Sequence, residues 1–342
     1  MEFQNIIIRM PNWLGDVVMA TPVIAELRKR FPEARITAMC QNNVASLLTG
    51  NPHIDEIFSF SRPNHFLRKQ ENRDVIGRLR QGKYDLGILL TNSFSSAWWF
   101  WRSGIKRRLG FANEGRTILL TDRVPFPKER GEEHLVVTYK RVLSPLGIGI
   151  SDTPPELFVT PEERAIVETI LQENHVPLEG KLIGINPGAA FGPAKCWLPE
   201  RFRQVAFKLL ENPENTILFF GDEGSKSLVK EITQGMPGRV VNLAGMTKLR
   251  ELVALIERCD VFLTNDSGPM HIAAAVRTPL LALFGSTSDI ATGPYLFGKV
   301  IHKHVSCSPC YLRTCPIDFR CMKRIEVDEV VYELKKMLED SA

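Results

Sequence analysis

The stretch that decides the fold is residues 261–276, VFLTNDSGPMHIAAAV. Residues 261–264 are apolar or β-branched, which is typical of a buried strand, and the small and apolar residues from Pro269 onward predict a helix. A four-residue corner, 265–268, joins the two. A strand that passes through a tight corner into a helix is the repeating unit of α/β proteins.

The corner itself predicts an anion site. Asp266 or Ser267 can cap the helix, Gly268 lets another group approach the backbone, and Pro269 needs no amide partner at the first helical position. Such a corner directs N–H groups and the positive end of a helix dipole at one point, where phosphate is the usual occupant. The alternative is an ordinary helix cap without a ligand. His271, on the first turn, favours the anion, although a core histidine bonded to a carbonyl would also fit.

The same alternation extends over the rest of the chain. We expect strands at 6–9, 35–40, 56–60, 85–90, 182–186, 216–220, 261–264 and 280–284. We expect helices at 17–31, 43–48, 66–80, 162–173, 199–210, 225–233, 249–257, 269–276 and 327–338. This order predicts an α/β protein with parallel sheets covered on both faces, and ligands at the carboxyl ends of the strands.

The length predicts two domains. A chain of 342 residues is long for a single core, and the Pro- and turn-rich segment 149–161 is the best linker candidate. We therefore expect two Rossmann-like, doubly wound domains facing a cleft, at 1–155 and 156–325. Residues 326–342 would form a C-terminal helix that packs back on the N-terminal domain.

Composition excludes several classes of protein. The 44% hydrophobic and 24% charged residues are those of a globular protein, and a formal net charge of +4 is too small to indicate a nucleic-acid partner. No run of apolar residues is long enough to span a membrane, and the chain enters a strand without a signal peptide. We expect a cytoplasmic protein whose membrane contact is peripheral.

Two further loops of the second domain carry candidate binding residues. Gly188 lies in the small-residue loop 187–197, where Lys195 brings a positive charge; its pattern is not that of a P-loop, and no G-x-G-x-x-G follows a strand. In the loop 221–224, Glu223 can accept hydrogen bonds from ribose hydroxyls, although the loop also suits a helix cap. These loops and the 265–268 corner converge on a nucleoside diphosphate.

The segment 97–108, AWWFWRSGIKRR, combines three tryptophans with a basic cluster. It predicts either a helix with a buried face and a solvated end or an amphipathic patch for an anionic membrane surface. We expect Trp98 and Trp101 to be partly exposed. A separate cluster of four cysteines has the spacing C-x₂-C-x₄-C-x₅-C and predicts a structural zinc site, a disulfide set or plain thiols: Cys307, Cys310, Cys315 and Cys321.

Five motifs in order carry a resemblance to a family: PNWLGDVVM (11–19), TNSFSSA (91–97), NPGAAFGPAKCW (186–197), FFGDEG (219–224) and TNDSGPMHIAAA (264–275). The chain resembles the ADP-heptose:lipopolysaccharide heptosyltransferases, inverting glycosyltransferases of the GT-B fold, and is closest to heptosyltransferase II. Cys196 departs from the pattern, because a basic residue is common there, and the four-cysteine segment is not shared by every member.

The resemblance implies a role for individual residues. Asp16 would be the general base, Lys195 would bind the diphosphate, Glu223 the ribose, and Met246 would line the adenine pocket. The phosphates and the donor sugar would be surrounded by Asp266, Ser267, Gly268 and His271. For Asp16, a simple N-cap of the helix that follows is the alternative.

The reaction implied is heptose transfer from ADP-heptose to a heptose or Kdo hydroxyl of the inner core. The acceptor would be an anionic, lipid-anchored oligosaccharide, and its candidate contacts are Asn92, Ser93, Ser95, Ser96, Arg102, Lys106, Arg107, Arg108 and Arg116. No cofactor is expected for catalysis, because the residues include no Asp-x-Asp pair in a phosphate loop. The rival functions are a nucleotide-sugar epimerase of the same architecture and a nucleic-acid-binding module.

Overall fold

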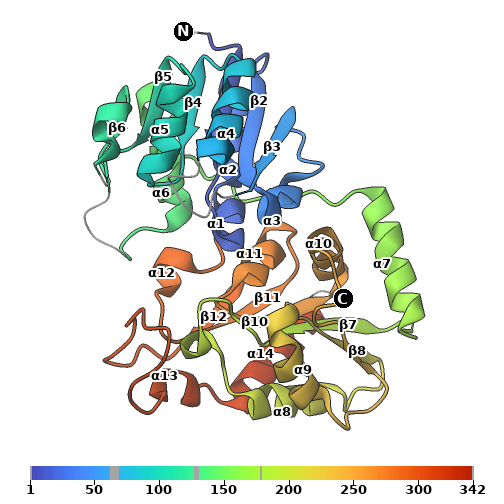
Figure 1. The fold of residues 1–342 in the computed structure, drawn as a ribbon. Coiled ribbons are helices and arrows are strands. Elements are labelled where there is room, and N and C mark those ends of the chain that lie inside the picture. Colours follow the sequence, from blue (N-terminus) through green and yellow to red (C-terminus); the bar gives the residue numbers. More distant parts are fainter. Residues whose placement is uncertain (1, 62–68, 114, 127–130, 178, 341–342) are drawn as a thin grey trace. The chain divides into compact units, whose positions relative to one another are not determined.

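The computed structural model describes residues 2–61, 69–113, 115–126, 131–177 and 179–340 (Figure 1). The chain divides into two compact units, Met1–Phe158 and Val159–Ala342. The division falls within the Pro-rich segment that was the linker candidate.

Unit 1 is built on a six-stranded parallel sheet in the order β3-β2-β1-β4-β5-β6. Its strands are β1 (Asn5–Arg9), β2 (Arg35–Gln41), β3 (Glu56–Phe60), β4 (Leu86–Leu89), β5 (Arg107–Phe111) and β6 (Asp122–Val124). Its α-helices are α1 (Leu14–Met19), α2 (Thr21–Arg30), α3 (Asn42–Ala45), α4 (Lys69–Gln81), α5 (Phe94–Arg102) and α6 (Leu135–Arg141). The short 3-10 turns are η1 (Ser46–Leu48), η2 (Arg116–Leu119) and η3 (Ser144–Leu146).

Unit 2 repeats this plan with the sheet order β12-β11-β10-β7-β8-β9. Its strands are β7 (Lys181–Asn186), β8 (Asn215–Phe219), β9 (Val240–Asn242), β10 (Val261–Asn265), β11 (Leu280–Phe284) and β12 (Lys299–His302). Its α-helices are α7 (Pro161–Glu173), α8 (Pro199–Leu209), α9 (Lys226–Thr233), α10 (Leu249–Arg258), α11 (Gly268–Ala275), α12 (Asp289–Thr292), α13 (Arg320–Lys323) and α14 (Val327–Asp340). Two 3-10 turns, η4 (Pro193–Lys195) and η5 (Glu223–Ser225), lie in its loops.

Both sheets are doubly wound, so the expected fold class is confirmed. In unit 2 alternate strand residues such as Ile183 and Ile185 pack under α8, α9 and α14, and their neighbours on the opposite face are buried as well. A central strand buried on both faces is the mark of a covered parallel sheet. The strand order reverses between β1 and β4 in unit 1 and between β7 and β10 in unit 2. Ligands of open α/β sheets bind at these switch points.

The first expected helix, 17–31, is in fact two helices. α1 begins at Leu14, and a break at Ala20 separates it from α2, which carries Pro22 in its first turn. Thr21 Oγ1 donates to the Val18 carbonyl across the break, at 2.8 Å. The expected helix 66–80 corresponds to α4, and residues 66–68 of that prediction lie outside the described residues.

Four strands were not expected from the sequence: β5, β6, β9 and β12. β6 and β9 have three residues each, and β5 and β12 begin with charged residues, so none shows an apolar run. Three of the four, β6, β9 and β12, are edge strands, where one side of the backbone has no partner strand.

The prediction that the C-terminal helix packs on the N-terminal domain is wrong. α14 packs on α8, and Val330, Leu334 and Leu338 belong to the core of unit 2. Trp197 extends this contact, because its indole Nε1 donates to the Ile325 carbonyl just before the helix. The apolar face that the sequence reveals has therefore found its partner within its own unit.

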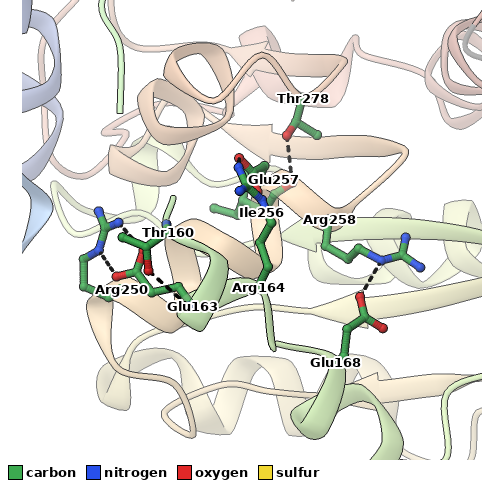
Figure 2. Close-up of polar contacts among 9 residues, drawn as sticks. All are labelled: Thr160, Glu163, Arg164, Glu168, Arg250, Ile256, Glu257, Arg258 and Thr278. Atoms are coloured by element: carbon green, nitrogen blue, oxygen red, sulfur yellow. Dashed lines mark hydrogen bonds and ion pairs between the residues drawn. The ribbon is translucent and has the colours of Figure 1, made fainter. Parts of the chain in front are cut away.

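Figure 2 shows how α7, the first helix of unit 2, is fixed to α10. Thr160 and Glu163 form a capping box at its start, and Glu163 Oε2 also lies 2.5 Å from Arg250. Two more ion pairs, Arg164–Glu257 at 2.8 Å and Glu168–Arg258 at 3.0 Å, lie further along the helix. The hydrogen bond from Arg250 is the main cause that lowers the pKa of Glu163.

Candidate active site

Lys195 and Asp266 meet at the switch point of the second sheet. Lys195 ends η4 in the loop after β7, and its Nζ lies 2.5 Å from Asp266 Oδ2 in the corner after β10. The two side chains are 14% and 4% exposed. Thr287 Oγ1 donates to the same carboxylate oxygen at 2.6 Å. The positive charge and the corner that the sequence indicated are thus adjacent, and Asp266 is an ion-pair partner of the lysine.

Two asparagines that we did not single out hold this loop in place. Asn265 Nδ2 donates to the Pro187 carbonyl at 2.7 Å, and Asn265 Oδ1 accepts from the Trp197 amide at 2.9 Å. Asn186 Nδ2 donates to the Gly188 carbonyl at 3.0 Å. Because both asparagines end neighbouring strands and are buried, they fix the two ends of the lysine loop. In the sequence, the only sign of this role is that β7 and β10, both apolar strands, each end in an asparagine.

The start of α11 has the features of an anion site. Ser267 occupies the N-cap position, yet its side chain makes no capping bond; its hydroxyl pairs with Thr264 Oγ1 at 3.0 Å. Gly268 and Pro269 follow as the first helical residues, and His271 lies in the same turn with 6% exposure. Since no N-cap side chain occupies the helix start, the geometry favours the anion interpretation over an ordinary cap.

Gly188 brings the loops after β7 and β8 together. A Cβ atom at Gly188 would lie 2.6 Å from Ser225 Oγ, so a larger residue would push the two loops apart. Ser225 is held in turn by Asp222, whose Oδ1 accepts its hydroxyl at 2.6 Å. Gly188 therefore permits its backbone to lie close to the Ser225 side chain at the carboxyl edge of the sheet.

Glu223 lies next to the turn that contains Met246, at the same edge of the sheet. Glu223 is 79% exposed, and its Oε2 lies 2.7 Å from Lys226 Nζ. Gly245, at φ +65°, packs so closely that a Cβ there would lie 2.9 Å from the same oxygen. Gly245 N donates to the Gly221 carbonyl at 2.8 Å, which joins the two turns. The Glu223 carboxylate is accessible, as binding a ribose requires.

Met246 borders a cavity of about 340 Å³ between its turn and α7, within the usual size range of ligand pockets. Its side chain is 65% exposed. The lining combines apolar and polar side chains: Ile166, Thr169, Ile170, Glu173, Asn174, Leu243, Met246, Thr247 and Glu251. The ion pairs of Figure 2 hold α7, and with it one wall of this cavity, against α10.

In unit 1, Asp16 lies inside α1 and not in a turn before it. It is the third residue of the helix, and Trp13 occupies the N-cap position, so the N-cap interpretation of Asp16 is wrong. The Tyr139 hydroxyl, from α6, donates to Asp16 Oδ1 at 2.8 Å. Burial, together with the Asp16 charge, raises the pKa of Tyr139 well above its usual value. The phenol therefore stays a donor at neutral pH.

Sequence reasoning missed Tyr139, since 123 residues separate it from Asp16. Asp16 lies in α1, the helix that follows β1, whereas Asn92 and Ser93 follow β4 on the other side of the switch point. Asn92 Oδ1 accepts from Arg116 at 3.3 Å, and Arg116 also donates to the Thr91 carbonyl. Arg116 is fully buried, so it positions this loop.

Arg116 was a candidate acceptor contact, and its burial excludes it; two more of the acceptor predictions do not fit the structure. Ser96 is 1% exposed, and its hydroxyl donates to the Ser93 carbonyl at 2.8 Å inside α5. Arg107 begins β5, opposite Leu86, and therefore lies at the amino edge of the sheet, away from Asn92. Its guanidinium is bonded to both oxygens of Asp122, at 3.1 and 2.9 Å. Ser96 is too buried and Arg107 lies at the opposite edge of the sheet, so neither remains a candidate acceptor contact.

The aromatic and basic segment forms α5 and the start of β5. Trp99 is buried and Trp101 is 49% exposed, while Trp98 is half-buried, as expected. Arg102 and Lys106 are exposed, and Ser93 caps the helix. In the described part of the chain, no helix has the length and apolar character needed to cross a membrane.

The four clustered cysteines are unbonded thiols in this structure. Cys321 is buried, Cys307 and Cys315 are half-buried, and Cys310 is exposed. Burial is the largest cause that raises the pKa of Cys321, and the three other thiols add to it. Among the described residues, three ligating atoms within 4.8 Å of one another occur in a different place, Asp289, His302 and His304.

Comparison with known proteins agrees with this geometry. Residues 73–319, more than two thirds of the chain, match the model of glycosyltransferase family 9 (heptosyltransferase). Lipooligosaccharide heptosyltransferase 2 of Haemophilus influenzae is 34% identical over 300 residues, covering 85% of this chain and 86% of the relative.

Two solved structures have the same fold over nearly the whole chain. The ADP-heptose lipopolysaccharide heptosyltransferase II of Escherichia coli is 28% identical, with a TM-score of 0.82 and coverage of 99% and 100% of the two chains. A family 9 glycosyltransferase of Veillonella parvula has a TM-score of 0.88 at 23% identity, covering 99% and 98%. The fold is therefore GT-B, and these matches do not favour an epimerase. The chain belongs to glycosyltransferase family 9, the heptosyltransferases, and is a glycosyltransferase.

Proposed function

We propose that the protein transfers a heptose from ADP-heptose to a heptose or Kdo hydroxyl of the lipopolysaccharide inner core, with inversion at the anomeric carbon. Relatives named lipopolysaccharide or lipooligosaccharide heptosyltransferase 2 support this substrate pair. The observation that carries the proposal is the buried Lys195–Asp266 pair beside the start of α11, at the switch point where a sugar diphosphate would bind.

The donor binds along the carboxyl edge of the second sheet. Lys195, Gly188 and the first turn of α11 hold the diphosphate, with Ser267, Gly268 and His271 around it. Glu223 accepts hydrogen bonds from the ribose, and adenine occupies the cavity beside Met246. The adjacency of Glu223 to the 243–247 turn supports this order of subsites.

Transfer requires a base for the acceptor and stabilisation of the leaving group. Asp16 accepts the proton of the attacking hydroxyl, a role that contributes about 10²- to 10⁴-fold in rate. Tyr139 orients the Asp16 carboxylate. Lys195 and the helix start stabilise the charge that develops on the departing diphosphate, and Asp266 positions the lysine. No cofactor takes part in this scheme.

The acceptor approaches the loops of unit 1. Asn92 and the Ser93 and Ser95 hydroxyls are its candidate sugar contacts, at the same sheet edge as Asp16. The exposed Trp101, Arg102 and Lys106 suit an anionic, lipid-anchored acceptor at the cytoplasmic face of the inner membrane. Nucleic acid has no part in this function.

One experiment tests the proposal. The protein is incubated with a core-lipid acceptor and, in separate reactions, with ADP-heptose, a UDP-sugar and a GDP-sugar, and nucleotide release is measured with and without acceptor. Of the three donors, we expect only ADP-heptose to release its nucleotide, and only when the acceptor is present. Conversion of the donor without an acceptor would identify an epimerase, and release from another nucleotide sugar would refute the assignment of the donor.

The four clustered cysteines remain candidate ligands of a structural zinc ion. Their spacing supports this, although among the described residues no three of these sulfur atoms lie within 4.8 Å of one another. Metal analysis of protein purified without added zinc, compared with the Cys307→Ser/Cys310→Ser variant, tests the proposal. Equal zinc content in the two proteins would exclude the cysteine site.

A further inference from the structure

Asp289, His302 and His304 place three ligating atoms within 4.8 Å of one another. His302 ends β12 and Asp289 begins α12, so two neighbouring elements of unit 2 supply them. His302 Nδ1 lies 3.0 Å from Asp289 Oδ1, and His304 Nε2 lies 3.5 Å from Asp289 Oδ2. The ligands of a tetrahedral zinc ion lie about 3.3 Å apart, given metal–ligand distances of about 2.0–2.1 Å. The two histidine–carboxylate separations fall on either side of that value, each to a different oxygen of Asp289.

The hydrogen bonds of Ser308 fix the tautomer of His302. The Ser308 hydroxyl donates to the Gly285 carbonyl, so its oxygen must accept from His302 Nε2, which lies 2.8 Å away. With Nε2 carrying a hydrogen, Nδ1 of a neutral ring turns a lone pair toward the Asp289 carboxylate. A lone pair and a carboxylate oxygen at 3.0 Å repel each other unless a cation lies between them.

A divalent cation between these side chains would contact all three of them. The His304 ring lies against the His302 ring, with centroids 4.0 Å apart, and both rings present a nitrogen to the Asp289 carboxylate. The His302 side chain is only 2% exposed, and a buried polar atom needs a partner. A metal-binding histidine commonly donates a hydrogen bond from its second ring nitrogen to an oxygen, as His302 Nε2 does to Ser308 Oγ.

We propose that Asp289, His302 and His304 bind one divalent transition-metal ion, with zinc as the best match to an N₂O ligand set, and that water completes its coordination. This site goes beyond the proposed transferase function. It also differs from the cysteine cluster, because none of its three ligands is a thiolate.

The ion would stabilise the loop that supports the donor site. Asp289 lies two residues after Thr287, which donates to Asp266, and the Ser286 carbonyl accepts from the Cys310 and Tyr311 amides at 3.1 and 2.7 Å. An ion held by Asp289 and His302 would link α12 to the end of β12 and would so restrain the loop that precedes α12. We therefore expect the ion to raise thermal stability independently of turnover.

The test uses full-length, untagged protein stripped of metal with a chelator and titrated with Co²⁺ near neutral pH. Histidine and carboxylate ligands give visible d–d bands, and only thiolates add a strong near-ultraviolet charge-transfer band. We expect the Asp289, His302 and His304 site to bind one equivalent of Co²⁺ and to show visible bands without a thiolate band. Zn²⁺ should displace the Co²⁺. Zn²⁺ should also raise the melting temperature.

His304→Asn and His175→Asn form a matched pair for this test. Both histidines are exposed and have positive φ, 38° and 54°, which asparagine tolerates, but His175 lies just after α7, outside the cluster. His304→Asn and Asp289→Asn should lose this Co²⁺ signal and the zinc-dependent stabilisation, and His175→Asn should keep both. Absence of Co²⁺ binding, a signal with thiolate character alone, or an unchanged signal in His304→Asn would each overturn the proposal.

Discussion

Lys195 Nζ and Asp266 Oδ2 lie 2.5 Å apart across the point where the strand order of the second sheet reverses. The lysine thus has a buried partner of opposite charge before any phosphate is present. Under the proposed function, the donor diphosphate would share the ammonium with Asp266, and the carboxylate would tune the affinity of the site for anions.

Replacing Lys195 should affect binding and stability together. In Lys195→Met the buried Asp266 carboxylate loses its counter-charge, and removal of one partner of a buried pair costs about 3–5 kcal/mol of unfolding free energy. Donor affinity should fall more than tenfold. Urea denaturation and calorimetric titration with ADP measure the two effects.

The double variant Lys195→Met/Asp266→Asn separates these effects. It should regain most of the lost stability, because no unpaired charge remains, but not the affinity for ADP. Recovery of ADP binding in the double variant would show that Lys195 does not contact the diphosphate.

Asp16→Asn should keep the donor and lose the reaction. The amide has the shape of the carboxylate but cannot accept a proton, so we expect turnover to fall by about 10²- to 10⁴-fold with ADP affinity unchanged. Single-turnover assays with ADP-heptose measure the loss. Turnover within a few-fold of the wild type would remove Asp16 from the mechanism.

Tyr139→Phe should move the pH dependence of the reaction. A hydrogen bond to a carboxylate favours its ionised form, so without the phenol the base becomes protonated at a higher pH. We expect the acidic limb of the kcat/KM profile to shift upward, with ADP binding unchanged. Because the pKa of Tyr139 is raised, the wild type should show no loss of this bond on the alkaline side up to about pH 10. A profile of unchanged shape would assign Tyr139 a packing role only.

Arg107→Ala should weaken the fold without changing acceptor recognition. Its bonds to Asp122 lower the pKa of that carboxyl, so the pair contributes stability above the unfolded pKa of about 3.9 and loses it as the pH falls through the folded value. We expect a loss of about 1.5–3 kcal/mol at neutral pH that shrinks below about pH 4. Urea titrations at several pH values measure it, and a raised KM for acceptor would return Arg107 to the binding surface.

Charge reversal at Arg102 and Lys106 should weaken action on membrane-presented acceptor. Both side chains are exposed at the end of α5 and the following turn, beside the half-exposed Trp101. The double variant Arg102→Glu/Lys106→Glu should bind vesicles containing anionic lipid less well, with ADP affinity unchanged. Equal vesicle binding in a co-sedimentation assay would count against a membrane role for this patch.

The long apolar runs made the fold predictable, and their order along the chain placed each binding loop at a strand end. β5 was not predicted because it starts with two arginines. Without that strand, the position of Arg107 at the amino edge of the sheet could not be predicted either. Contacts between distant residues were equally beyond reach: nothing near Asp16 in the sequence points to Tyr139, and nothing near Lys195 shows that Asn265 fixes its loop.

The packing of α14 has a consequence for how the protein is made. Trp197 lies two residues after Lys195 and donates to the carbonyl of Ile325, 128 positions later. α8 packs on α14, the helix that follows Ile325. A ribosome therefore synthesises every strand of unit 2 before α14, which completes the core of that unit, whereas unit 1 ends at Phe158. Unit 1 should therefore complete its fold first, and unit 2 should stay incompletely folded for longer during synthesis.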